Sequence, residues 1–166
     1  MAVTVAAVLL AASTIFQNTI INRMTLLVGT ADLVLLVLLS WMLQADDRNL
    51  LKFGLIAGVF IGISSAVPVW ACVLGYGAVA GMVMLMNMRI WQAPYWMLLT
   101  STFFGTVIVY GLEILVLWIS GYPYDLGEML EMVIVPSIVL NILFVLPVYF
   151  FVGEITKLVY PKEVQV

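Results

Sequence analysis

Apolar residues follow one another along most of this chain, and short polar stretches divide them into segments of similar length. The polar stretches lie around residues 22–25, 44–49, 87–94 and 120–132, and another follows residue 152. A helix of about 20 predominantly apolar residues crosses the hydrocarbon core of a bilayer. The pattern therefore predicts six membrane-spanning helices, at about residues 3–21, 26–43, 50–67, 69–88, 95–119 and 133–152.

The overall composition agrees with this interpretation. Hydrophobic residues make up 65 % of the 166 residues, charged residues only 9 %, and the mean hydropathy is +1.22. A soluble domain usually contains about 25 % charged residues. We therefore expect an all-α integral membrane protein, with residues 1–166 forming one transmembrane domain, a compact bundle of six helices in a lipid bilayer.

The third and fourth predicted helices carry small residues at helical spacing. Glycines recur every four residues on one face of each helix: Gly54, Gly58 and Gly62 in the first, and Gly77 and Gly81 in the second. In lipid, helices associate through close backbone approach, which such faces permit. The pattern predicts a tight helical hairpin, and it leaves open whether the glycine face packs on an internal helix or on a partner.

Basic residues in short loops predict the orientation in the membrane. One side has Arg23 alone, whereas the other side collects Arg48, Lys52, Arg89, Lys157 and Lys162. This asymmetry predicts that both termini are cytoplasmic. The loop 120–132, which contains Asp125 and two glutamates but no basic residue, then faces outward.

Two carboxylates, Asp32 and Glu113, fall inside predicted helices. The predicted orientation puts both in the outer half of the membrane. A charge at this depth is costly and normally faces a partner or a cavity. Arg23 in the outer turn could offset one of them, or each side chain could simply reach the interface. Together with Asp125 these residues are candidates for binding a partner.

The last predicted helix contains an asparagine and two prolines. A proline within a membrane helix frees a backbone carbonyl that neighbouring groups must satisfy. Asn141 lies near the middle of the membrane, where a hydrogen bond to another helix contributes roughly 0.6–2 kcal/mol. We therefore expect Pro136 and Asn141 to take part in helix packing.

The sequence offers no evident set of catalytic residues. It has no histidine and one cysteine, Cys72, so it lacks a histidine–cysteine metal cluster and a histidine base for a nucleophile. It also lacks a glycine-rich phosphate loop and a basic stripe of the kind that binds nucleic acid. We expect a protein that is not an enzyme and that needs neither a cofactor, a metal nor a nucleic acid.

Several segments resemble MreD, the rod shape-determining membrane protein family of bacteria. Gln17 follows an apolar run in the first helix, and Ala31-Asp32-Leu33 is similar to the Pro-Asp-Leu motif that heads the family's second helix. Residues 53–58 resemble the glycine-rich third helix. The run 136–149, with Asn141 and Pro147, resembles the last helix. Length and six-span layout agree as well.

This resemblance implies a scaffold and not an enzyme. Members of the family act in the machinery that elongates the bacterial cell and regulates its shape. They bind MreC, which has one span and a periplasmic coiled coil, and through it they connect to the MreB filament and to the RodA–transpeptidase pair that makes peptidoglycan. The resemblance also implies a location in the bacterial cytoplasmic membrane. Asp32 is the residue that matches a family acidic position.

Two other interpretations remain open. Substrate-binding subunits of energy-coupling-factor vitamin transporters are six-span proteins of similar size, and the glycine face and the outer carboxylates would suit that role. However, such sites need several polar side chains around the ligand, and we expect few in the outer half of this chain. A lipid-active membrane enzyme is the third interpretation, and it lacks visible catalytic residues.

Overall fold

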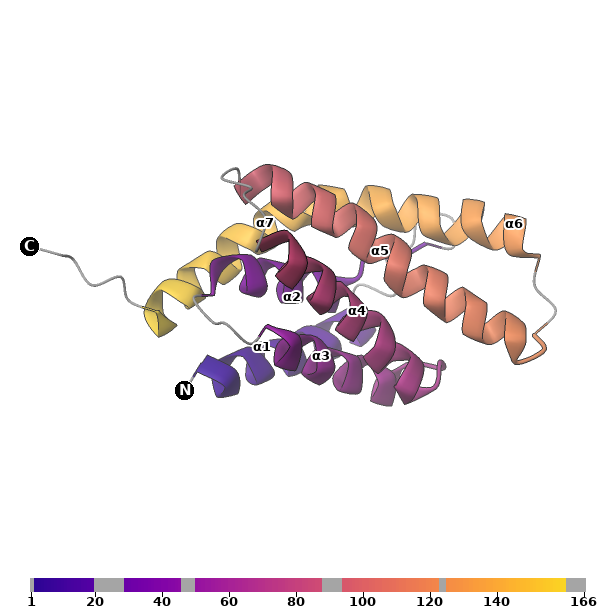
Figure 1. The fold of residues 1–166 in the computed structure, drawn as a ribbon, viewed down its shortest axis with the longest axis horizontal. Helices are drawn as coiled ribbons and strands as arrows, with labels where there is room; N and C mark the ends of the chain where they lie inside the picture. Colours follow the sequence, from indigo (N-terminus) through magenta and orange to yellow (C-terminus); the bar gives the residue numbers. More distant parts are fainter. Residues whose placement is uncertain (1, 20–28, 46–49, 88–93, 123–124, 161–166) are drawn as a thin grey trace, which may run out of the picture.

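The computed structural model describes residues 2–19, 29–45, 50–87, 94–122 and 125–160. Their helices are α1 (Ala2–Thr19), α2 (Leu33–Gln44), α3 (Leu51–Ser64), α4 (Val69–Asn87), α5 (Pro94–Ile119), α6 (Leu126–Met129), the π-helical turn η2 (Leu130–Ile134) and α7 (Val135–Val159). The last three follow one another without a break. Helix α1 begins and helix α7 ends at the same end of the elongated bundle (Figure 1).

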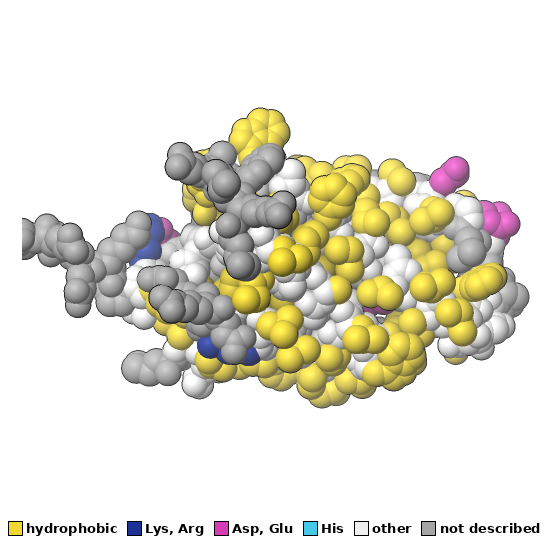
Figure 2. Space-filling model, in the orientation of Figure 1, with side chains coloured by type: hydrophobic (Ala, Val, Ile, Leu, Met, Phe, Trp, Pro, Cys, Tyr) yellow, Lys and Arg dark blue, Asp and Glu magenta, His cyan; other side chains and the backbone are white. Residues whose placement is uncertain are grey.

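Four of the described helical segments are long and apolar enough to cross a membrane: Ala2–Thr19, Val69–Asn87, Pro94–Ile119 and Gly127–Val159. This confirms a multi-pass helical membrane protein. Figure 2 shows the apolar side chains covering the middle of the visible face, while charged side chains gather towards the two ends. Helices α2 and α3 are also apolar, but they have only 12 and 14 residues.

Helix α2 is shorter than the sequence predicted. The second span was expected over residues 26–43, but the helix begins only at Leu33. At 1.5 Å per residue, 12 residues reach about 18 Å, well short of a hydrocarbon core of about 30 Å. Hydropathy did not reveal this start because an apolar sequence looks the same whether it is helical or extended.

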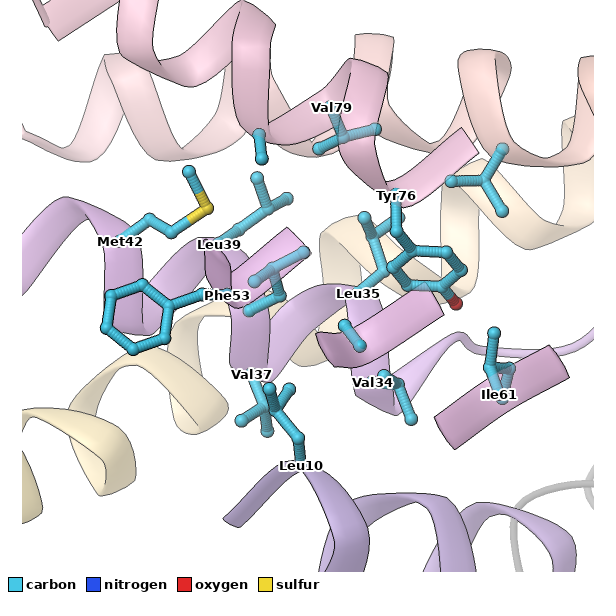
Figure 3. Packing of buried hydrophobic residues seen from close by; sticks show 14 of the residues in the cluster. Leu10, Val34, Leu35, Val37, Leu39, Met42, Phe53, Ile61, Tyr76 and Val79 are labelled. Carbon is cyan, nitrogen blue, oxygen red and sulfur yellow. The ribbon is translucent and has the colours of Figure 1, made fainter. Parts of the chain in front are cut away.

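This short helix is the centre of the bundle. It contacts α1, α3, α4, α5 and α7, and every residue from Val34 to Met42 is at most 4 % exposed. A helix that is apolar on all sides is stable only when it is surrounded in this way. Figure 3 shows side chains of α2 packed among those of neighbouring helices. The residues labelled there are Leu10, Val34, Leu35, Val37, Leu39, Met42, Phe53, Ile61, Tyr76 and Val79.

The predicted glycine hairpin is present, and its glycine face packs on an internal helix. A Cβ atom added at Gly54 would lie 2.6 Å from the backbone oxygen of Tyr76, and one added at Gly58 would lie 2.5 Å from Cα of Val73. Both contacts are with helix α4. Gly62 has the same relation to α4, so three successive turns of α3 lie directly on its backbone.

The two glycines of α4 do not form a matching seam. A Cβ atom added at Gly77 would make only an ordinary contact with a leucine side chain at 3.5 Å, and one added at Gly81 would meet nothing within 4 Å. Gly77 therefore meets α3 only at an ordinary contact distance, and Gly81 has no close neighbour among the described residues. The glycines of α3 instead face Val69, Val73, Tyr76 and Ala80 of α4.

The expectation for Pro136 is confirmed. The proline is buried near the start of α7. It lies against Gly29, where an added Cβ would come within 2.8 Å of the proline Cβ and of the backbone oxygen of Val133. The segment that leads into α2 is thus packed tightly on α7.

We predict that Gly58→Ala destabilises the protein by about 1–3 kcal/mol, because the added methyl group meets the backbone of α4 and the core must shift to admit it. Gly81→Ala is the matched control, since its methyl group would enter open space. Reversible unfolding of both purified variants in detergent measures the difference. Equal stabilities for the two variants would show that the seam is not closely packed.

Candidate functional site

Helix α2 begins inside the bundle, where its first backbone N–H groups have no helical partner. Three side chains accept hydrogen bonds from this region. Asp32 Oδ1 accepts from the backbone N–H of Leu35 at 2.9 Å, Gln17 Oε1 accepts from that of Val34 at 3.1 Å, and Asn141 Oδ1 accepts from that of Asp32 at 2.7 Å. The cap is therefore built by α1, α7 and the residue that precedes α2.

This cap belongs to a larger buried network. The hydroxyl of Tyr76 in α4 donates to Asp32 Oδ2 at 2.5 Å, and Asn141 Nδ2 donates to Thr106 Oγ1 in α5 at 2.9 Å. Asp32 is only 2 % exposed and Asn141 is fully buried. The expected bond from Asn141 to another helix is confirmed, and the same side chain also holds the start of α2.

A polar cavity of about 250 Å³ adjoins the network. The last residue of α3, Ser64, and the turn that follows, through Ser65 and Ala66, form part of its wall. Ile61 and Ala66 are the lining residues with apolar side chains. The other lining residues bring hydroxyl, phenol, amide and carboxylate groups to one space, and they come from the surrounding helices and from the segment before α2.

Glu113 of α5 is the second carboxylate in this wall. Among the described residues it receives one hydrogen bond, from the thiol of Cys72, with Sγ and Oε1 4.0 Å apart. A thiol is a weak donor. No lysine or arginine of the described chain lines the cavity, so its wall holds two acidic side chains without a basic one from those residues.

The four candidate partner-binding residues have different positions. Asp32 and Glu113 line one cavity, as their shared depth suggested, but Asp32 is buried and bonded within the protein. Asp125 is exposed, does not line the cavity, and accepts a hydrogen bond from the backbone N–H of Gly127 at 2.7 Å. Arg23 lies outside the described residues.

The expectation of few polar groups in this half of the bundle is wrong. Tyr76 and Tyr110 both contribute hydroxyl groups to the cavity, and Thr30 and Gln17 add further polar atoms. Tyrosine is counted among the hydrophobic residues of the composition, so these two were not treated as polar. The sequence did contain one signal of their polar role. Both tyrosines lie in the middle of helices, whereas tyrosine in membrane proteins is usually found at the membrane interface.

No protein-family model matches this chain, and no curated protein or solved structure is significantly similar to it. The structure by itself thus defines the class, which is a multi-pass helical membrane protein with a polar cavity beside the head of its central helix. Within the described residues, no group of three or more His, Cys, Asp or Glu side chains is placed to hold a metal. The cavity is suited to binding a small polar ligand.

We predict that Asp32→Ala destabilises the protein by about 1–3 kcal/mol, because it removes the cap on Leu35 and leaves the Tyr76 hydroxyl without its acceptor. Asp32→Asn is the informative comparison, since its amide oxygen can still accept from the backbone of α2. Thermal unfolding in detergent should rank the proteins as wild type, Asn variant, Ala variant. A stable Ala variant would show that α2 does not depend on this cap.

Proposed function

We propose that this chain is a non-enzymatic scaffold of the bacterial cell-elongation machinery, similar to MreD. It would cross the cytoplasmic membrane six times with both termini in the cytoplasm. Its direct partner would be an MreC-like protein with one span and a periplasmic coiled coil. Through that partner it would act on the MreB filament and on the RodA–transpeptidase pair, and so help regulate peptidoglycan synthesis and cell shape.

The observation that carries the proposal is the meeting of three residues at the head of α2. Gln17, Asp32 and Asn141 belong to three separate segments that resemble the family, and all three cap the same helix end. Apolar helices resemble one another by composition, but composition alone gives no reason for three particular polar residues to converge. Because all three residues cap the same helix end, their positions support the proposal that this chain shares the architecture of the family.

The distribution of charge supports the proposed orientation. Figure 2 shows lysine side chains at one end of the molecule and a group of acidic side chains at the other. Lys157 lies in the last turns of α7, at the end where α1 begins. Asp125, Glu128 and Glu131 lie around α6, at the opposite end, and are exposed. Basic residues are enriched on the cytoplasmic side of membrane proteins.

A second candidate function is that of a substrate-binding subunit of an energy-coupling-factor vitamin transporter. The polar cavity favours it, because a ligand site of this kind needs several convergent polar side chains. The internal use of the glycine face weighs against it, because Gly54, Gly58 and Gly62 already pack on α4 and so do not present a free face to an energising partner.

Affinity purification from native membranes in mild detergent, followed by mass spectrometry, separates the two candidates. We expect a single-span coiled-coil protein to co-purify, together with enzymes of wall synthesis. An unrelated tagged membrane protein is the control for non-specific capture. Recovery of paired cytoplasmic ATPases with a second multispan protein would instead overturn the scaffold proposal in favour of the transporter.

The acidic residues around α6 are the expected docking surface for the periplasmic part of the partner. We predict that the triple variant Asp125→Asn, Glu128→Gln, Glu131→Gln weakens co-purification of the coiled-coil protein several-fold, because it removes three exposed negative charges. Glu154→Gln is the control, since Glu154 is an exposed carboxylate near the other end that forms an ion pair with Lys157. Equal recovery with both variants would exclude this surface.

A further inference from the structure

We propose that the cavity beside the head of α2 binds a small ligand through a primary ammonium group, with Glu113 as the counter-ion. This inference does not depend on the scaffold proposal, because it rests only on the cavity wall. It concerns a site distinct from the exposed acidic surface around α6.

The two carboxylates of the cavity are used differently by the fold. Both oxygens of Asp32 are engaged, one by the backbone N–H of Leu35 and the other by the Tyr76 hydroxyl. Glu113 receives only the weak thiol contact from Cys72 among the described residues. A carboxylate can accept about four hydrogen bonds, so Glu113 has acceptor capacity that the described chain leaves unused. Asp32 holds the structure together, whereas Glu113 is available to a ligand.

Three hydroxyl groups of the wall already donate their hydrogens to other protein groups. Tyr76 donates to Asp32, Tyr110 donates to the backbone oxygen of Thr30 at 3.1 Å, and Ser64 donates to backbone oxygens of its own helix. Each of these oxygens keeps lone pairs that can accept. These three oxygens and Glu113 therefore present acceptors and negative charge, which a ligand with N–H donors and positive charge would complement.

These properties select an ammonium group over other ligands. An anionic or phosphate-bearing group would meet two carboxylates with no lysine or arginine of the described wall to balance it. Calcium and magnesium ions need six or more oxygen ligands, usually with several carboxylates, and the described residues offer no cluster of three. A primary ammonium has three N–H donors and fits beside a single free carboxylate. The volume of about 250 Å³ leaves room for a small organic group attached to it.

Such an ammonium group has two sources at a membrane, a free amine in solution and the ethanolamine headgroup of a phospholipid. The first test uses the full chain in detergent, with ethanolamine as the probe and choline as the comparison. Choline carries the same charge but has no N–H donor. We expect ethanolamine to raise the unfolding temperature by about 3 °C or more at ten times its Kd, and choline to have a clearly smaller effect.

The second test places the protein in nanodiscs of phosphatidylcholine, with or without phosphatidylethanolamine. Stabilisation by the ethanolamine lipid without an effect of free ethanolamine would assign the site to a lipid headgroup. Stabilisation by free ethanolamine would assign it to a soluble amine. Both results support the ammonium site, whereas stabilisation by neither, or an equal response to choline, overturns it.

Glu113→Gln is the decisive variant. It keeps the shape of the side chain, and among the described residues the fold loses only a weak thiol contact, so the unliganded protein should unfold at or above the wild-type temperature. We predict that its affinity for the stabilising ammonium compound falls at least about tenfold, because the charge-assisted bonds are lost. Glu154→Gln serves as the control for a general loss of negative charge. Unchanged binding by Glu113→Gln would refute the assignment.

Discussion

The structure depends on the way in which the first turn of α2 is satisfied. A helix that begins in the interior of a membrane protein has backbone N–H groups that water cannot reach, and each one left unpaired costs several kcal/mol. Side chains from α1 and α7 and the carboxylate of Asp32 meet this demand together. Because the cap draws on elements far apart in sequence, it ties the surrounding helices to one central point.

The glycine seam and the cap are parts of one arrangement. Gly54 lies against the backbone oxygen of Tyr76, so the close approach of α3 to α4 fixes the residue whose hydroxyl reaches Asp32. A larger residue at Gly54 would push α4 outward and draw the phenol away from the carboxylate. The packing of small residues between α3 and α4 therefore also determines whether the Tyr76 hydroxyl can bond to the Asp32 carboxylate.

The sequence predicted the parts of this arrangement that are local. Gly54, Gly58 and Gly62 share a helix face whatever the rest of the chain does, so their seam could be expected. The common depth of Asp32 and Glu113 also followed from the order of the predicted spans. In contrast, the start of α2 at Leu33 depends on partners contributed by α1 and α7, which a pattern within one segment does not contain. The polar character of the cavity was missed because Tyr76 and Tyr110 were counted with the hydrophobic residues.

Two carboxylates of the same chemistry thus perform opposite tasks in one cavity. Both oxygens of Asp32 accept hydrogen bonds from the protein, and the cost of burying this carboxylate is offset by the helix that it caps. Glu113 has little that offsets its cost within the described residues. A charge at membrane depth normally faces a pairing group or a water-filled cavity. The two residues thus differ in how many hydrogen bonds they receive from the described protein: Asp32 stabilises the fold, whereas Glu113 keeps acceptor capacity for a ligand. One cavity can therefore contain both a structural carboxylate and a ligand-binding one.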